Sequence, residues 1–377
     1  MGTRVLTGRY FADGNTACVE GAIAAGLEFY AAYPITPSSE IAERMARRLP
    51  EVGGVFVQAE DEIAAISMVI GASASGAKAM TATSGPGFSL MAESVGLAAM
   101  LEIPCVIVDM MRGGPSTGQP TKTSQQDVMQ AKWSSHGDYE IIALAPSTVQ
   151  EIFDLTIEAF NLSERYRTPV ILLGDALLSH TKEVLTIPPP DQITIVERKK
   201  PTVPPSMYLP YEAPEDLVPP LPKYGEGYLF HMTGLTHNVR GEPDMRAKAQ
   251  EELVKRICDK IRRNARQIAK TEAFMTEDAE VLFVAYGTCA RMLKAHIKRA
   301  REEGHRVGLL RLITIWPFPY WEVEKLSNGV KKVVVVEMNY GQILHPVREA
   351  SKAEVSFHPV LGERIIRYEE VIRHVEG

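Results

Sequence analysis

The stretch "FYAAYPITPSSEIAERMARRL", residues 29–49, decides the fold of the chain. Its apolar first part suits a single strand, and the apolar residues of its second part recur at the spacing of an amphipathic helix. We expect Thr36 to be the N-cap of this helix, with Pro37 at its first position and Pro34 stiffening the approach from the strand. Because a cap needs no preceding proline, a functional role of Thr36 remains an alternative.

The same unit of strand and helix recurs on both sides of this stretch. Further apolar strand candidates are residues 54–59, 77–83, 104–110, 139–144 and 169–175, with helical patterns between them. Strands that are apolar at every position and are separated by helices are typical of a parallel sheet covered on both faces. Residues 1–187 are therefore predicted to form an α/β domain.

A proline-rich segment follows this domain. Residues 188–222 hold eleven of the 25 prolines, which cannot continue a helix or a central strand. We interpret residues 188–275 as a linker that ends in a charged helix, from about residue 243 to 273. Strand candidates resume at 280–287, 306–313 and 331–338, so residues 276–377 are predicted to form a second, smaller α/β domain.

Composition narrows the possible partners. The net charge is −6 and the chain has no long basic run, so the charge pattern does not favour nucleic acid or an anionic membrane. The four cysteines are scattered singly, without a C-x-x-C pair for zinc or an iron–sulfur cluster, and we interpret them as reduced core thiols. The first residues lack an apolar signal region, and no apolar run approaches the ~20 residues that span a bilayer. We expect a cytoplasmic protein whose partners are small molecules or other proteins.

An apolar helix pattern over residues 60–76 begins with three acids. The helix dipole favours acids at an N-terminus, which is enough to explain Glu60 and Asp61. Glu62 is followed at once by four apolar residues, so we expect its carboxylate to lean toward an apolar neighbourhood that raises its pKa. Such a carboxyl group is suited to sharing a proton with a ligand nitrogen. On the residues alone, capping of the helix remains the alternative for Glu62.

The loop "MRGGPSTGQPTKTSQQD", residues 111–127, is too polar and too rich in glycine for a core segment. In an open parallel sheet, loops at the carboxyl ends of strands line the ligand crevice, and the same end carries "YPITPSSE" and "ATSGPG". Arg112 is the one cation at a strand exit, where its guanidinium can hold a carboxylate through two hydrogen bonds. A surface arginine without a role remains the alternative.

Motifs of other chemistry are missing or incomplete. No G-x-G-x-x-G follows the first strand, so a nicotinamide site lacks its fingerprint. The "LGDA" at 173–176 lacks the downstream asparagine of a Gly-Asp-Gly motif for thiamine diphosphate and magnesium, and no metal site is evident. No G-x-S-x-G elbow supports an acyl-transfer enzyme or amide hydrolase. His231 and His237 could suggest a metal pair, but without a third ligand we interpret them as structural.

The chain resembles the alpha subunit of the 2-oxoacid:ferredoxin oxidoreductases over nearly all of its length. The segments that carry the resemblance, in order, are "GNTACVEGAIAAGLEFYAAYPITPSSEIAE", "VQAEDEIAAISMVIGAS", "TSGPGFSLMAE", "MRGGPSTGQPTKTSQQDV", "RLITIWPFP" and "VVVVEMNYGQ". The resemblance implies an α/β first domain of the thiamine-enzyme pyrimidine-binding type with a parallel sheet. It also implies a last domain like the C-terminal domain of transketolase.

The resemblance also assigns site residues. Glu62 matches the glutamate that contacts the aminopyrimidine of thiamine diphosphate, nine residues before a helix glycine, here Gly71. Thr36 matches the threonine beside the 2-oxoacid, and Arg112 matches the arginine that holds the substrate carboxylate. The diphosphate and Mg²⁺ belong to a beta subunit in this family, consistent with the missing Gly-Asp-Gly motif. The chain is therefore expected to supply half of an active site.

The reaction implied by the resemblance is the oxidative decarboxylation of a 2-oxoacid. Coenzyme A takes the acyl group, and electrons pass singly through iron–sulfur clusters to ferredoxin. Because this chain has no cluster motif, the clusters are expected on partner subunits. The expected partners are a beta subunit with thiamine diphosphate and a cluster, a gamma subunit and a ferredoxin-like delta subunit.

The loop at 112–127 suggests the substrate. It resembles the loop of the subfamily that acts on 2-oxoglutarate more than that of the subfamilies that act on branched-chain 2-oxoacids or pyruvate. That subfamily forms succinyl-CoA and CO₂. We expect Lys122 or Thr121 to help hold the distal carboxylate, since a second negative charge in a dry pocket needs a partner. The same chemistry on 2-oxoisovalerate or pyruvate remains an alternative, as does a non-catalytic docking role in such a complex.

Overall fold

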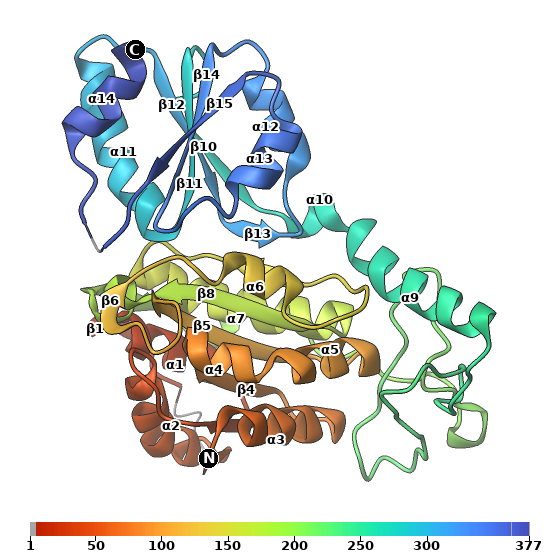
Figure 1. The fold of residues 1–377 in the computed structure, drawn as a ribbon. Helices are drawn as coiled ribbons and strands as arrows, with labels where there is room; N and C mark the ends of the chain where they lie inside the picture. The colour runs from red at the N-terminus through yellow and green to blue at the C-terminus, as the bar shows by residue number, and fades with distance from the viewer. Residues whose placement is uncertain (1–4, 363, 377) are drawn as a thin grey trace.

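The computed structural model describes residues 5–362 and 364–376, which form two α/β bodies stacked on each other and an extension on one side (Figure 1). The strands are β1 (Gly8–Asp13), β2 (Phe29–Ala32), β3 (Val55–Gln58), β4 (Ala79–Thr83), β5 (Cys105–Gly113), β6 (Gln119–Thr123), β7 (Ile142–Leu144), β8 (Pro169–Asp175), β9 (Lys182–Ile187), β10 (Thr271–Phe274), β11 (Val281–Tyr286), β12 (Val307–Leu312), β13 (Thr314–Trp316), β14 (Lys332–Glu337) and β15 (Glu354–Pro359). The helices are α1 (Gly14–Ala24), α2 (Ser39–Glu51), α3 (Glu62–Ala74), α4 (Gly85–Leu90), α5 (Ala92–Leu101), α6 (Val128–Trp133), α7 (Val149–Tyr166), α8 (Ala176–His180), α9 (Ala247–Arg262), α10 (Ala265–Ile268), α11 (Gly287–Glu302), α12 (Tyr320–Ser327), α13 (Leu344–Ala350) and α14 (Tyr368–Glu376), with 3-10 turns η1 (Pro190–Gln192) and η2 (Pro205–Met207).

The first body is built on a sheet with the strand order β13-β7-β8-β5-β4-β2-β3, and β6 pairs with β5. Strands β2, β3, β4, β5, β7 and β8 pair in parallel with one another, which confirms the predicted parallel sheet. Helices α1, α2 and α7 pack on one face, and α3 and α5 pack on the other. Because both faces are covered, a largely apolar and fully buried strand such as β5 is stable at the centre of the sheet.

The second body has the strand order β10-β12-β11-β14-β15, with β10 antiparallel to β12 and the other pairs parallel. Helices α11 and α14 pack on one face of this sheet, and α12 and α13 pack on the other. The expected start of this domain at residue 276 falls after β10, which already belongs to the second sheet.

The two bodies share one apolar cluster and one sheet. Residues of β11, β12 and β14 join the apolar cluster that lies under α3 and α5 of the first body. Strand β13 leaves the second body and pairs antiparallel with β7, at the edge of the first sheet. The two bodies are therefore packed together by side chains and by backbone hydrogen bonds.

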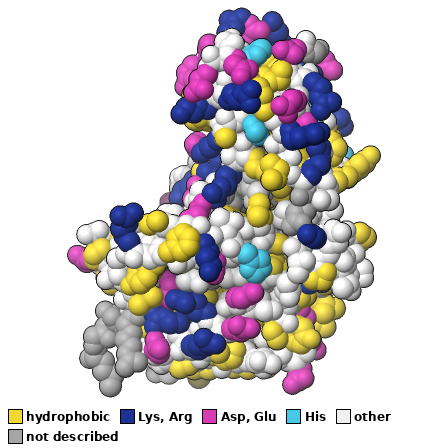
Figure 2. Space-filling view, turned by 90° about the vertical axis from the view of Figure 1, so that its left-hand side faces the viewer, with side chains coloured by type: hydrophobic (Ala, Val, Ile, Leu, Met, Phe, Trp, Pro, Cys, Tyr) yellow, Lys and Arg dark blue, Asp and Glu magenta, His cyan; other side chains and the backbone are white. Residues whose placement is uncertain are grey.

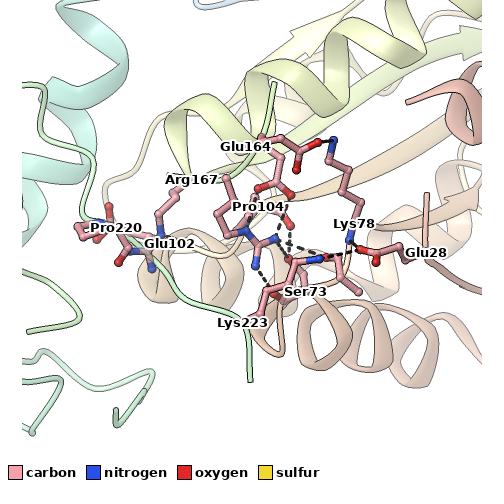
Figure 3. Close-up of polar contacts among 12 residues, drawn as sticks. Glu28, Ser73, Lys78, Glu102, Pro104, Glu164, Arg167, Pro220 and Lys223 are labelled. Carbon is pink, nitrogen blue, oxygen red and sulfur yellow. Dashed lines mark hydrogen bonds and ion pairs between the residues drawn. The ribbon is translucent and has the colours of Figure 1, made fainter. Parts of the chain in front are cut away.

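The proline-rich segment is irregular but anchored (Figure 3). Arg198 Nε donates to Glu164 Oε2 at 2.8 Å, and its Nη1 donates to the carbonyl of Ser73 at 2.6 Å. From the first body, Arg167 Nη1 reaches the carbonyl of Pro219 at 2.9 Å. These buried charge-assisted bonds hold the segment against the ends of α3 and α7. The predicted charged helix is found as α9 and the short α10, but its predicted end near residue 273 is wrong because β10 begins first.

The structure also bears on the expectations that were drawn from composition, namely those for the cysteines, for membrane-spanning helices and for surface charge. The four cysteines are free and buried, which confirms their interpretation as core thiols. Within the described residues, no helix has the length and apolar character that crossing a bilayer requires. On the face drawn in Figure 2, acidic and basic side chains are interspersed over both bodies.

Candidate active site

The carboxyl ends of β2, β4 and β5 meet at one edge of the first sheet, because these strands are parallel neighbours. The segment that carries Thr36 follows β2, the start of α4 follows β4, and Arg112 lies at the end of β5. Helix α3, which begins with Glu62, follows the adjacent strand β3. The topology thus brings together the three site residues that the sequence predicted.

Glu62 occupies the first position of α3 without capping it. The N-cap is Asp61, whose carboxylate accepts a hydrogen bond from the backbone N–H of Ala64 at 2.7 Å. The Glu62 side chain is 4% exposed, whereas Glu60 is exposed. Burial raises the pKa of the Glu62 carboxyl, and Asp61 adds to the shift while Arg112 opposes it. The predicted desolvation of Glu62 is confirmed.

Glu62 packs directly against the start of α4. A Cβ atom on Gly87 would lie 2.2 Å from Oε1 of Glu62 and 2.1 Å from Oγ1 of Thr83. Both distances are far shorter than ordinary van der Waals contact. Only glycine at this position leaves room for the Glu62 carboxyl beside the end of β4.

Arg112 lies in β5 itself, because this strand continues two residues beyond the predicted loop start. Its Nη1 donates to the carbonyl of Thr36 at 2.8 Å, and its Nη2 donates to the carbonyl of Thr117 at 3.0 Å. Nε is buried and has no hydrogen-bond partner in the part of the chain that the structure describes. A guanidinium that is held by two carbonyls and keeps further N–H groups unused, including that of Nε, is ready to bind an anion.

The predicted N-cap role of Thr36 is wrong. Helix α2 begins later, with Ser38 as its N-cap, and the hydroxyl of Ser38 donates back to the carbonyl of Ile35 at 2.8 Å. Asn15 Nδ2 donates to the carbonyl of Pro37 at 2.9 Å. These contacts fold residues 35–38 into a turn ahead of the helix, so that the carbonyl of Thr36 faces the arginine of β5.

The polar loop after β5 folds back as a hairpin. Strand β6 pairs antiparallel with the end of β5, with Thr123 opposite Arg112. The sequence did not predict this strand, because "QPTKT" has no apolar alternation. Thr121 and Lys122 lie on β6 and are exposed, so the structure does not bury them with Thr36, Glu62 and Arg112.

The second body holds the chain that leaves this hairpin. Gln125 donates from its backbone N–H to the carbonyl of Met338 at 3.0 Å and from Nε2 to the carbonyl of Tyr286 at 3.1 Å. Asn339 Nδ2 donates to the carbonyl of Gln125 at 2.6 Å, and the hydroxyl of Ser124 donates to Met338 at 3.1 Å. All five residues are buried, where satisfied hydrogen bonds favour one arrangement strongly. The second body therefore fixes the base of the hairpin.

Asp175, at the end of β8 in the segment "LGDA", also connects the hairpin with the second body. Asp175 accepts hydrogen bonds from the hydroxyl of Thr123 at 3.1 Å, the hydroxyl of Thr288 at 2.5 Å and the backbone N–H of Leu178 at 2.9 Å. Thr288 belongs to α11 of the second body. The carboxylate of Asp175 thus joins the two bodies beside the hairpin.

A cavity of about 410 Å³ opens beside Arg112. Its walls come from the start of α4, from the hairpin and Asp127, and from Asn339, Tyr340 and Gln342 of the second body. The acids around the guanidinium, Asp127 and the fully buried Asp109, oppose the lowering of the pKa of Arg112 that burial causes. Arginine remains charged in such a setting, since its ordinary pKa lies far above neutrality.

The residues present fit one half of a thiamine diphosphate site. Glu62 offers a buried carboxyl of raised pKa, the chemistry that contact with an aminopyrimidine nitrogen requires. Among residues 5–362 and 364–376, no group of three or more histidine, cysteine, aspartate or glutamate side chains could hold a metal ion.

Comparisons with known proteins agree with this geometry. A family model described as pyruvate flavodoxin/ferredoxin oxidoreductase, thiamine diphosphate-binding, matches residues 20–256, and one for pyruvate:ferredoxin oxidoreductase core domain II matches residues 279–371. The 2-oxoglutarate synthase subunit KorA of Methanothermobacter thermautotrophicus is 52% identical over 98% of this chain and 99% of that protein. The chain belongs to the 2-oxoacid:ferredoxin oxidoreductase family. Its two matched regions fit an alpha-type subunit.

Other relatives of this oxidoreductase subunit include KorA of Methanocaldococcus jannaschii, 53% identical over 97% of this chain and 99% of that protein. The ketoisovalerate oxidoreductase subunit VorB of M. thermautotrophicus is 38% identical over 97% of each chain. A structure of 2-oxoglutarate:ferredoxin oxidoreductase from Magnetococcus marinus with 2-oxoglutarate, coenzyme A and succinyl-CoA bound superposes with a TM-score of 0.93 at 35% identity. That match covers 98% of this chain and 65% of the other.

A more distant structure shares the fold alone. A split gene transketolase matches 96% of this oxidoreductase subunit with a TM-score of 0.56 at 12% identity. The predicted fold, a thiamine-enzyme domain followed by a domain like the C-terminal domain of transketolase, is confirmed by these matches.

Sequence reasoning missed three residues that shape the site of this oxidoreductase subunit. Asp109 is a lone acid in an apolar strand, and that contrast could have drawn attention to it. Gly87 lies in "TSGPG", where nothing local shows that a carboxyl group will approach it. Asp127 follows the polar "SQQ" and gives no signal, since its importance depends on residues that only the fold brings near.

Proposed function

We propose that this chain is the alpha-type subunit of a thiamine diphosphate-dependent 2-oxoglutarate:ferredoxin oxidoreductase. The reaction is the oxidative decarboxylation of 2-oxoglutarate to succinyl-CoA and CO₂ with reduction of ferredoxin, or its reverse. The observation that carries the proposal is the buried carboxyl of Glu62, which fits beside Gly87 because glycine has no side chain. Arg112, whose Nε has no partner among the described residues, belongs to the same site. The similarity to KorA subunits at 51–53% identity supports the choice of substrate.

Glu62 has the role of holding a proton at the cofactor. Burial raises its pKa, which makes the protonated form more accessible than in an ordinary glutamate, so a proton can be shared with a ring nitrogen. Thiamine diphosphate, when bound, supplies the electron sink for the carbon–carbon bond that breaks. Asp61 fixes the start of α3, and Glu62 is therefore free to serve the cofactor.

Arg112 and Thr36 have the role of binding the 2-oxoacid. The two carbonyl contacts of Arg112 orient its guanidinium, and the remaining N–H groups of this cavity-lining side chain can bind the substrate carboxylate. Thr36 is half-buried in the turn after β2, where its hydroxyl can lie beside the same substrate.

Partner subunits complete this half-site. Ile63 and Met68 on α3 and Leu90 on α4 are 50%, 39% and 51% exposed next to the site, as expected of a surface that another subunit covers. We assign that cover to a beta subunit that binds the diphosphate and Mg²⁺ and carries an iron–sulfur cluster. Gamma and ferredoxin-like delta subunits complete the complex, with ferredoxin as the electron acceptor and coenzyme A as co-substrate. The setting is cytoplasmic.

The distal carboxylate of 2-oxoglutarate is assigned to Lys122 or Thr121. Both lie on β6 of the hairpin and are exposed in this chain, so the partner subunit must help to enclose them. Lys122→Met should raise the Michaelis constant for 2-oxoglutarate at least tenfold more than those for pyruvate and 2-oxoisovalerate, since only 2-oxoglutarate has a second carboxylate. Equal effects on all three acids would refute this assignment.

The deciding experiment replaces Glu62 by Gln in the complex co-expressed with its partner subunits. Reduction of ferredoxin or viologen is measured with 2-oxoglutarate, pyruvate and 2-oxoisovalerate in the presence of coenzyme A. We expect 2-oxoglutarate to be preferred, and we expect Glu62→Gln to lower turnover at least 100-fold, because the amide cannot exchange the proton. Glu60→Gln is the matched control, an exposed acid two residues away, and should keep normal turnover. Full turnover in Glu62→Gln would instead mean that the chain is a docking subunit.

A further inference from the structure

Asp109 is an acid buried in the centre of the first sheet. The alternation of side chains along β5 places it between Ile107 and Met111, on the face that α3 and α5 cover. Its side chain is fully buried, and neither of its oxygens accepts a hydrogen bond from a donor group of the described residues. An isolated carboxylate in such a place costs several kcal/mol. A proton removes most of that cost.

Asp127 lies beside Asp109, just before α6. A Cβ atom on Gly85 would come 2.9 Å from Oδ2 of Asp127, so the carboxyl packs closely against the start of α4. Oδ2 is buried, and no donor group in the described part of the chain reaches it. With no other donor for these buried oxygens among the described residues, the two neighbouring carboxyl groups can hydrogen-bond only to each other, and they can do so only when one of them carries a proton.

We propose that Asp109 and Asp127 share a single proton and thereby present one negative charge, and not two, to the guanidinium of Arg112. Asp127 also lines the cavity beside this arginine, so the charge of the pair lies where a substrate carboxylate would bind. The inference deepens the proposed function and rests on it, because it assumes that Arg112 binds the carboxylate of the 2-oxoacid.

The proton belongs mainly to Asp109. Burial raises the pKa of Asp109 well above its ordinary value, and the neighbouring Asp127 raises it further. Burial also raises the pKa of Asp127, to about 6, while its hydrogen bond with Asp109 and the charge of Arg112 act in the opposite direction. At neutral pH the pair therefore consists of a protonated Asp109 that donates to an ionised Asp127.

The other groups around the pair leave this charge state intact. From α3 the ionisable neighbour is Glu62, whose pKa burial raises. From the second body, the cavity wall contributes Asn339, Tyr340 and Gln342, none of which is a carboxylate or a basic side chain. The pair therefore adds one anion, and not two, to the surroundings of Arg112.

This balance has a consequence for catalysis. A substrate carboxylate at Arg112 has to compete with the anion of the pair, and that competition ends when the carboxylate departs as neutral CO₂. The pair therefore weakens binding of the substrate more than binding of the transition state, in which the carboxylate is losing its charge. Removing the charge of the pair should lower both the Michaelis constant and the turnover number.

The shared proton is tested first by infrared spectroscopy of the assembled complex at pH 7. The difference spectrum between wild type and Asp109→Asn should contain the carbonyl band of a protonated carboxyl group. The matched control is Asp154→Asn, which replaces an exposed acid on α7 and should leave that band unchanged. If wild type lacks the band, or if Asp109→Asn retains it, the proposal is overturned, whatever the substrate of the enzyme.

The charge at Arg112 is tested with oxalate as an unreactive competitive inhibitor of 2-oxoacid turnover. The double variant Asp109→Asn/Asp127→Asn has no charge in the pair and should bind oxalate about tenfold more tightly, the order of magnitude expected for one nearby charge. Asp109→Asn retains the charge of Asp127, so its inhibition constant should change far less, whereas Asp127→Asn leaves only the protonated Asp109 and should resemble the double variant. Equal inhibition constants for wild type and the double variant would overturn the proposal.

The pH dependence gives a signature that a merely structural role would not produce. In wild type, oxalate should bind more tightly as the pH falls through about 6, because protonation of Asp127 then removes the charge of the pair. The double variant should not show this step, and a wild type without the step would contradict the proposal. Arg112→Met separates the two hypotheses: if it leaves oxalate inhibition unchanged, the proposed function fails, although the infrared band still reports the shared proton.

Discussion

Replacing Gly87 by Ala tests the packing that shapes the site. The new Cβ would lie 2.2 Å from Oε1 of Glu62, against about 3.4 Å for ordinary contact, so the carboxyl group has to move by about 1.2 Å. Thr83 blocks the other side, at 2.1 Å from the same Cβ, and the 4% exposure of Glu62 leaves little room to turn away. Since a misplacement of about 1 Å can cost roughly 100-fold in rate, kcat should fall by about that factor.

The assay is ferredoxin reduction by the complex, together with thermal unfolding to confirm that the variant folds. In a background of Glu62→Gln, the additional Gly87→Ala substitution should cost little more, because the group that it displaces no longer functions. Our reasoning is refuted if Gly87→Ala alone retains more than half of the wild-type kcat. It is also refuted if the losses of the two substitutions simply multiply.

Three further predictions concern stability and substrate binding. Burial disfavours the charge of Glu102, but Lys260 and Arg256 at 2.7 and 2.6 Å help to hold its pKa at about 2. Glu102→Gln should therefore lower the unfolding free energy in urea at pH 7 by about 3–5 kcal/mol, and this difference should shrink as the pH falls from about 4 toward 2, where the native carboxylate is protonated. Gln125→Ala should raise the Michaelis constant for the 2-oxoacid about tenfold in steady-state assays while the chain stays folded, because the hairpin loses the side-chain bonds of Gln125 to Tyr286 and Met338 and keeps only its other contacts with the second body; an unchanged constant would contradict the positioning role. Arg112→Lys should lower kcat/KM at least tenfold, since lysine cannot make the two-pronged contact with a carboxylate.

Local patterns predicted the central strands of each sheet and the edge strand β3, and missed most of the other strands at the margins. Strands such as β5 and β14 are largely apolar because helices cover both faces, so their sequence alone reveals them. Strands β6 and β10 are polar or partly exposed and pair antiparallel at the margins, and β1 pairs with β9 in a separate two-stranded sheet, so none of them requires an apolar alternation. The predicted elements therefore define the two bodies, whereas most of the strands that join or border them emerge only from the structure.

The same distinction explains the site. Burial of Glu62 was expected from the four apolar residues that follow it in its own helix. In the structure its carboxyl is instead covered by the start of α4, at Gly87, beside Thr83, while Ile63 is 50% exposed. The turn at Thr36 is fixed instead by Asn15 and Arg112, which lie 22 residues from Pro37 and 76 residues from Thr36 in the chain. A local capping rule cannot anticipate such contacts, and it misplaced the start of α2.

The antiparallel pairing of β13 with β7 determines where this chain could be divided into two polypeptides that still form the same fold. A break in the extension, for instance near the 92% exposed Leu229, would leave β13 and the partners of Gln125 on the C-terminal fragment. Two polypeptides separated there should reassemble, because β13 of the C-terminal fragment would pair with β7 of the N-terminal fragment and complete the first sheet. A break between β12 and β13 would instead divide the second sheet, because β14 and β15 would be separated from β10, β11 and β12, so the tolerated division lies upstream of the second body and not within it.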